Sequence, residues 1–203
     1  MTRGGTRLPM AGGELPLPSA PIFQRVAIVG LGCVGASLAL ALRSAWPGAL
    51  VIGIGAHAEL ETAIRLHAID VGADDLEIAA DADVVVLCGS AAENARALPY
   101  LADAIRGEAV ILSLGGGTEP RSAAAAALPS RLPLVVGVPR LDPPAGHVEA
   151  ARADLFRGRR WTISPGAAPE AAVERVRGLV RAVGGEPDAG TLPPPVRPSR
   201  AAE

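Results

Sequence analysis

The chain has 203 residues and a formal net charge of -2; 49% of the residues are hydrophobic and 20% are charged. This length and composition allow one well-buried domain and exclude a collagen-like or wholly disordered chain. The basic residues are all arginines and are scattered along the chain, so no nucleic-acid partner is expected.

Two features of the sequence concern its location. Residues 26–42 carry no charge, but the stretch contains several glycines and ends at Arg43, short of the about 20 apolar residues that a membrane span requires. The first residues do not combine a basic start with an apolar run, and the cysteines form no disulfide framework. We therefore expect a cytoplasmic protein with no membrane partner.

Strand-like and helix-like segments alternate through the middle of the chain. Pro- and Gly-rich residues 1–21 and 185–203 are expected to be disordered tails around one domain at 22–184. Continuous apolar runs predict strands at 25–30, 49–54, 82–88, 109–114, 132–138 and 160–164. The segments between them predict helices at 34–44, 58–67, 91–105, 119–127, 148–156 and 168–183. This alternation predicts an α/β fold with a doubly wound, mostly parallel sheet.

A G-x-G-x-x-G pattern follows the first predicted strand, where a strand turns into a helix. The glycines of such a loop permit a tight turn, close approach of a pyrophosphate and close packing of the helix, whose N-terminus attracts negative charge. The candidate pyrophosphate-binding residues are Gly30, Leu31, Gly32, Cys33, Val34 and Gly35. The residues expected on the nicotinamide side, at the end of strand 82–88, are Cys88, Gly89 and Ser90. These residues predict a Rossmann-type domain that binds NAD or NADP, and the alternative is a close-packed turn that holds no ligand.

The residue that distinguishes NAD from NADP is missing from its usual place. An acidic residue about 20 positions after the glycine loop normally binds the ribose hydroxyls at the end of the second strand. Gly55 stands there in this sequence, and no arginine follows closely to receive a 2′-phosphate. His57 and Glu59 are the nearest polar candidates, so the sequence leaves the choice of dinucleotide open.

Several segments together resemble a known family. VAIVGLGCVGASLALAL, VIGIG, HAIDVGADDLEIAADADVVVLC and, most specifically, the ARADLF-x-G-x-x-W segment at 151–161 carry this resemblance. Over residues 25–185 the chain resembles the nucleotide-binding half of the prephenate/arogenate dehydrogenases of tyrosine biosynthesis. The resemblance implies an NAD(P)-dependent oxidative decarboxylation, in which the ring carbinol of prephenate loses hydride and carbon dioxide departs.

The resemblance also shows what this sequence lacks. Members of the family usually carry a serine in a G-S-V-K stretch and a histidine in a G-H-P segment, and the matching positions here are Gly116 and Val138. Neither residue has a side chain that accepts a proton, and loss of a general acid or base typically costs about 10²–10⁴-fold in rate. The family normally continues into a helical domain that binds the substrate carboxylates, and residues 185–203 offer no replacement. We therefore expect little or no activity of the chain alone.

Two functional interpretations remain open. The first is an oxidoreductase domain that acts on a small anionic substrate, with a separate helical or mutase chain as partner and His147 as a surrogate base. The second is a pseudoenzyme, a non-catalytic nucleotide-sensing or partner-binding module. No metal is expected, because the histidines are far apart in sequence. Cys33 and Cys88 are expected near each other at the cofactor crevice, either as small apolar residues or as a redox-sensitive pair.

Overall fold

The computed structural model describes residues 20–115, 128–141 and 146–188. These residues form one eight-stranded sheet in the order β3-β2-β1-β4-β5-β6-β7-β8. The strands are β1 Arg25–Val29, β2 Leu50–Ile54, β3 Val71–Ala73, β4 Val84–Leu87, β5 Val110–Ser113, β6 Leu134–Pro139, β7 Arg160–Ser164 and β8 Glu186–Asp188. All neighbouring strands are parallel except β6 and β7, which run antiparallel. The predicted doubly wound, mostly parallel sheet is therefore confirmed.

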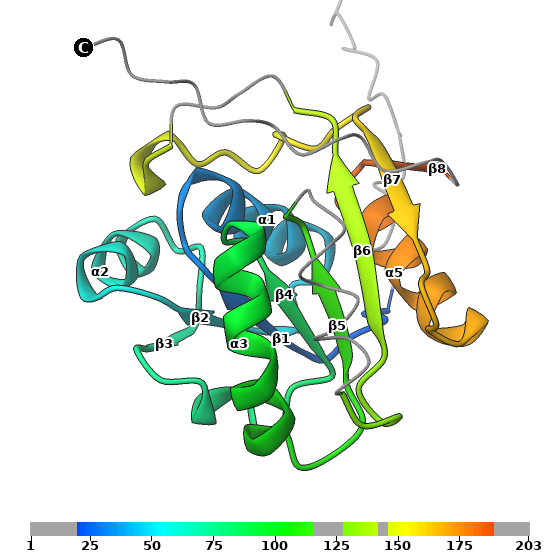
Figure 1. Ribbon diagram of the computed structural model, residues 1–203. Coiled ribbons are helices and arrows are strands. Elements are labelled where there is room, and N and C mark those ends of the chain that lie inside the picture. The colour runs from blue at the N-terminus through cyan, green and yellow to red at the C-terminus, as the bar shows by residue number, and fades with distance from the viewer. Residues whose placement is uncertain (1–19, 116–127, 142–145, 189–203) are drawn as a thin grey trace, which may run out of the picture.

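Helices cover both faces of the sheet (Figure 1). They are α1 Cys33–Ala45, α2 His57–Arg65, α3 Ala91–Ala104 and α5 Glu170–Ala182, with short 3-10 helices at η1 Glu77–Ala79 and η2 Val148–Ala150. Side chains alternate along each strand, so Val84 and Val86 pack with α1 and α5, while Val85 and Leu87 pack with α3. Burial on both faces explains why the sheet's central strands read as continuous apolar runs. No described helix is long and apolar enough to cross a membrane.

The segment predicted as a helix at 148–156 is different in the structure. Only the short 3-10 helix η2 forms there, and turns follow it. The N–H of Arg152 donates to the Ser37 hydroxyl of α1 at 3.0 Å, and the side chains of Leu155 and Phe156 are buried. These long-range contacts replace the hydrogen bonds of a regular helix. The helix predicted at 119–127 lies outside the described residues.

Two short edge strands were not predicted. β3 is the outermost strand next to β2, and β8 pairs with β7 at the opposite edge. β8 lies in the segment 185–203 that the sequence predicts as a tail, and it follows a turn at Gly184, where φ is +81°. The N–H of Glu186 then donates to the Arg159 carbonyl at 2.8 Å, so residues 186–188 belong to the sheet. The rest of that segment lies outside the described residues.

Candidate functional site

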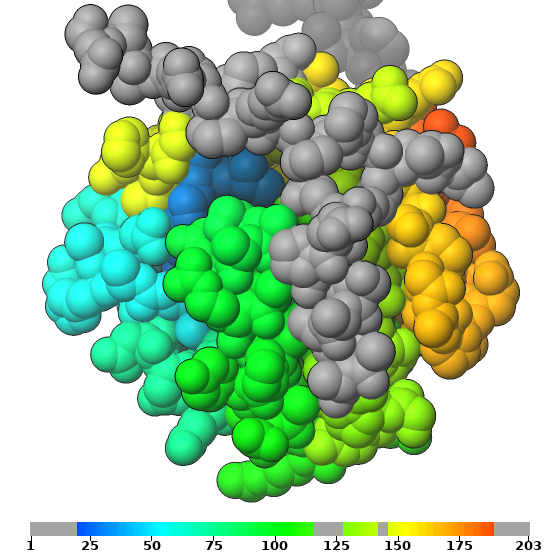
Figure 2. Space-filling view, viewed as in Figure 1, coloured from blue at the N-terminus to red at the C-terminus, as the bar shows by residue number. Residues whose placement is uncertain are grey.

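A cleft of about 610 Å³ opens at the carboxyl ends of β1, β2 and β4. The chain adds β2 and β3 on one side of β1 and then returns to add β4 on the other side, so the strand order reverses at β1. A crevice at such a point is the usual ligand site of doubly wound sheets. In Figure 2 the green atoms of α3 and the cyan atoms around α2 lie on the same face of the molecule, beside this crevice. The cleft is lined by Val29, Gly30, Gly32, Ile54, Gly55, Glu59, Asp74, Leu76, Cys88, Gly89, Ser90, Glu93, Asn94 and Ala97.

The glycine loop forms one wall of the cleft. Gly30 has a φ of +88°, which residues with a side chain rarely adopt, and its N–H donates to the Ile54 carbonyl at 2.8 Å. A Cβ on Gly35 would lie 2.0 Å from the Gly30 carbonyl oxygen, so only glycine allows α1 to start this close to β1. Gly32 caps α1 without a side-chain hydrogen bond, and the first turn contains no acidic residue. The N–H groups of this turn are therefore suited to an anion.

The opposite wall comes from the end of β4 and the start of α3. Ser90 and Glu93 form a capping box, in which the Ser90 N–H donates to the Glu93 carboxylate at 2.8 Å. Hydrogen bonds from the Ser90 hydroxyl and from its N–H lower the pKa of Glu93, and the charge of nearby Arg96 adds to this effect. The buried Asn94 amide of α3 donates to the Leu87 carbonyl of β4 at 3.2 Å and to the Ser113 hydroxyl of β5 at 3.1 Å. This wall is thus rigidly tied to the sheet.

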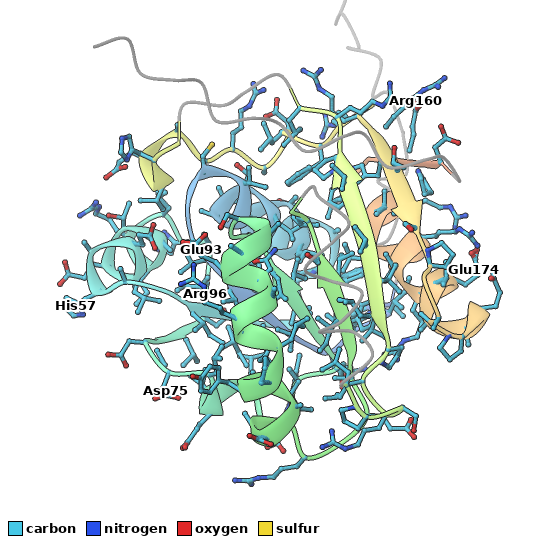
Figure 3. The ribbon with its side chains drawn as sticks, in the orientation of Figure 1. His57, Asp75, Glu93, Arg96, Arg160 and Glu174 are labelled. Carbon is cyan, nitrogen blue, oxygen red and sulfur yellow. The ribbon has the colours of Figure 1, made fainter. Side chains whose placement is uncertain are left out.

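The outer end of the cleft is acidic. Glu59 from α2, Asp74 directly after β3 and Glu93 from α3 all line it. Figure 3 shows Glu93 and Arg96 together on the side of α3 that faces α2. Ile54, Leu76 and Ala97 supply apolar surface. A mainly apolar cleft with a few convergent polar groups is typical of small-molecule sites.

The structure brings some of the sequence-predicted site residues to the cleft and leaves others beneath it. The predicted residues that line the cleft are Gly30, Gly32, Cys88, Gly89 and Ser90. Leu31 and Cys33 are buried, and Val34 and Gly35 contribute to packing behind the loop. Sequence reasoning missed the cleft residues that follow β3 or lie on α3. Of these, only Glu93 had a sequence signal, the Ser-x-x-Glu capping pattern at 90–93.

Val138 and His147 do not line this cleft within the described ranges. Val138 is on β6, and Gly116 is outside the described residues. His147 is exposed at the start of η2 and is not among the cleft-lining residues within the described ranges. The neighbouring Gly146 carbonyl oxygen lies 3.5 Å from the place of a Cβ on Gly32, so this segment passes beside the glycine loop without bringing the imidazole into the cleft.

Cys33 and Cys88 are both free thiols. The Cys33 sulfur lies 3.5 Å from the Ala150 carbonyl oxygen, whereas the Cβ of Cys88 packs against the position of Gly35. Burial raises the pKa of the Cys88 thiol to about 12, so it is protonated at neutral pH. Each side chain thus packs against the groups around it, and the redox-sensitive pair stays a hypothesis. No group of His, Cys, Asp and Glu suited to a metal occurs in the part of the chain that the structure describes.

The parallel sheet, the glycine loop and the crevice beside it define a Rossmann-type domain. Residues 38–187 match the family model described as prephenate dehydrogenase, nucleotide-binding domain. The chain therefore belongs to this family, and the resemblance expected from the sequence is confirmed. The match begins inside α1, so the geometry of the glycine loop is an observation independent of it.

Individual relatives agree with this membership. The chain is 29% identical over 161 residues to prephenate dehydrogenase of Bacillus subtilis (strain 168), covering 77% of this chain and 43% of that protein. Crystallised prephenate dehydrogenase from Aquifex aeolicus has a similar fold, with a TM-score of 0.75, 22% identity and coverage of 81% of this chain and 60% of the other. Synechocystis arogenate dehydrogenase has a TM-score of 0.69 and 23% identity, with coverage of 81% and 58%. This chain spans about half the length of these relatives.

Proposed function

We propose that this chain binds a nicotinamide dinucleotide, NAD or NADP, as the cofactor domain of an oxidoreductase of the prephenate dehydrogenase type. The observation that carries the proposal is the uncapped N-terminus of α1 at the edge of the cleft. The pyrophosphate would lie against the loop from Gly30 to Gly35, with the nicotinamide side near Cys88, Gly89 and Ser90. When bound, the nicotinamide accepts a hydride. A solved Aquifex aeolicus relative contains NAD+ together with hydroxyphenyl propionate, which supports this choice of cofactor and a small anionic substrate.

Calorimetric titration with NAD and NADP tests the proposal. Gly32→Val is the informative variant, because a Cβ there meets nothing closer than 3.5 Å and the fold should survive, while the side chain would block the approach of a pyrophosphate. Gly48→Val is the matched control, since a Cβ on Gly48 has no neighbour within 4 Å and Gly48 does not line the cleft. We expect binding by the wild type and the control and loss of binding in Gly32→Val. A wild-type protein that binds neither dinucleotide at about millimolar concentration, roughly -4 kcal/mol of binding energy, would refute the proposal.

We further propose that the chain alone turns over prephenate or arogenate slowly or not at all. Valine at position 138 cannot take a proton, and His147 does not reach the cleft within the described structure. Following NAD(P)H absorbance with either substrate measures this directly. Turnover at ordinary enzyme rates, on the order of 1–10³ per second, would contradict the prediction, and His147→Ala would then show whether this histidine is the base.

Val138 also supports a second candidate function. A domain that binds a dinucleotide but has no proton acceptor could be a nucleotide-sensing or partner-binding module, or it could be the cofactor domain of an enzyme whose other part is a separate chain. Adding a helical or mutase chain from the same source tests the two, because a gain of prephenate-dependent activity would identify an enzyme domain and contradict the sensor. The cytoplasmic location expected from the sequence stays a prediction that cell fractionation tests.

A further inference from the structure

We propose that Glu59 replaces the missing ribose-binding carboxylate and makes the site select NAD over NADP. This inference rests on the proposed dinucleotide binding and adds the residue that sets its specificity. Gly55 stands where the acidic residue is expected at the end of β2. Glu59 is the third residue of α2, the helix that begins just after this glycine.

The carboxylate of Glu59 lies directly beside the place that a side chain at position 55 would take. A Cβ built on Gly55 would lie 3.1 Å from the Glu59 Oε2 and 3.7 Å from the backbone nitrogen of Leu31 in the glycine loop. Glu59 thus reaches back from α2 to the same edge of the cleft that a carboxylate on residue 55 would serve. The absence of a side chain at Gly55 leaves room for this approach.

Glu59 faces the cleft, whereas His57, the other polar candidate on this helix, does not. Glu59 is half-buried, lines the cleft and has no hydrogen bond or ion pair anywhere in the described structure. His57, the other polar candidate, lies on the outside of α2, where its side chain is 87% exposed and its Nε2 is 3.2 Å from the Glu61 carboxylate. Figure 3 shows His57 pointing away from the body of the molecule. The structure therefore separates two candidates that sequence alone left equal.

The chemistry of the adenosine ribose explains the expected selectivity. A carboxylate accepts hydrogen bonds from two hydroxyl groups, and NAD presents a 2′- and a 3′-hydroxyl on this ribose. NADP replaces the 2′-hydroxyl with a phosphate, whose negative charge would face Glu59 and also Asp74, which lines the cleft directly after β3. Like charges repel each other, and the repulsion is stronger in a cleft than in open water. The acidic edge therefore favours the diol and rejects the phosphate.

Two other charged side chains, Glu93 and Arg96, lie near this edge. The Glu93 carboxylate accepts a hydrogen bond from the Ser90 N–H, and the Glu93 backbone N–H donates to the Ser90 hydroxyl in the same capping box. Arg96 lies beside Glu93 on α3 and contributes to the lowered pKa of that carboxyl, so its charge is partly offset. Arg96 does not line the cleft within the described structure. Arg96 nevertheless offers a rival role, as an anchor for a 2′-phosphate, and the experiment includes it for that reason.

The preference for NAD over NADP is compared in four proteins: the wild type, Glu59→Gln, Arg96→Gln and Glu61→Gln. Glu61→Gln is the control, because it removes a carboxylate from the outer surface of α2, the helix that carries Glu59. Calorimetry with NAD and NADP measures the preference, and ADP against 2′,5′-ADP measures it on the adenosine half alone. We expect the wild type to bind NAD at least about tenfold more tightly than NADP, equivalent to about 1.4 kcal/mol. Glu59→Gln should weaken NAD binding several-fold and strengthen NADP binding, while Glu61→Gln and Arg96→Gln should keep the wild-type preference.

The results that overturn the inference are distinct from those that overturn dinucleotide binding. An unchanged preference in Glu59→Gln, with both dinucleotides still bound and far-UV circular dichroism unchanged, would remove Glu59 from the site and leave the proposed function standing. A wild-type preference for NADP that disappears in Arg96→Gln would assign the 2′-phosphate to Arg96 and refute our inference. A wild type that binds none of the four ligands would overturn both proposals.

Discussion

Replacing Gly35 by alanine should destabilise the domain, because the added methyl group would overlap the backbone of the glycine loop. Its Cβ would lie 2.0 Å from the Gly30 carbonyl oxygen, 3.1 Å from the Gly30 carbonyl carbon and 3.4 Å from the Cβ of Cys88. Backbone atoms cannot rotate away, so α1 would have to move off β1. Overpacking of this kind costs about 1–3 kcal/mol, and the better helix propensity of alanine returns about 0.5–1 kcal/mol. We expect a net loss of roughly 1–2 kcal/mol in the free energy of unfolding.

Gly178→Ala is the matched control. Gly178 also lies inside a helix, α5, and a Cβ there would be 2.3 Å from the Ile22 Cδ1. That atom is the end of a flexible side chain that is 42% exposed, so Ile22 can turn towards solvent. The propensity gain then dominates, and this variant should be neutral or up to about 1 kcal/mol more stable.

Urea denaturation of both variants measures the difference in the free energy of unfolding. The Tm should change by about 2–4 °C for each kcal/mol in a chain of this size. Gly35→Ala should also bind dinucleotide more weakly, because the shift of α1 moves its N-terminal N–H groups away from the cleft. Gly178→Ala should bind as the wild type does. Equal unfolding midpoints for the two variants would show that the closeness of α1 and β1 does not depend on glycine at position 35.

Two more predictions concern acid and oxidation. Partial burial acts to raise the pKa of Asp70, but a hydrogen bond from the Val51 N–H and the ion pair with Arg43 hold the pKa below its usual value. This stabilisation is present above about pH 4 and is lost as the pH falls through the lowered pKa, so Asp70→Asn should cost stability at neutral pH and little in strong acid. An equal cost at both pH values in urea denaturation would contradict this. Peroxide should not join Cys33 and Cys88 in a disulfide, and a disulfide found by mass spectrometry would contradict this prediction. The raised pKa of Cys88 should make its alkylation slow in the native protein.

The sequence predicts those parts of the fold whose signals are local. Apolar runs predicted the six longer strands because burial on both sheet faces requires such runs, and the glycine pattern predicted the strand-to-helix turn. β3 and β8 have three residues each and lie at the sheet edges, so their pairing depends on what lies beside them. The turn structure after η2 likewise depends on a hydrogen bond to Ser37, which is distant in sequence.

The candidate site divides in the same way. Glycine-loop residues were predicted because their conformation follows from their own sequence. Asp74 and Leu76 reach the cleft only because β3 adds to the sheet beyond β2, and no short-range pattern marks that position. The choice between His57 and Glu59 required the orientation of α2, since residues two positions apart on a helix lie on nearly opposite sides, and here His57 points outward while Glu59 lines the cleft.

The residues proposed to bind the dinucleotide and the position that matches the family's histidine lie on different strands of this chain. The groups proposed to bind the dinucleotide lie at the ends of β1, β2 and β4 and are held by the helices that follow, so the described domain contains all of them. The position of the family's histidine is on β6, where Val138 provides an apolar side chain. A partner that supplies only positive charge for the substrate carboxylates would leave the hydroxyl proton without an acceptor. Prephenate-dependent activity would therefore require a partner that also supplies a base at the nicotinamide end of the cleft. A partner that supplies positive charge alone should increase substrate binding without turnover.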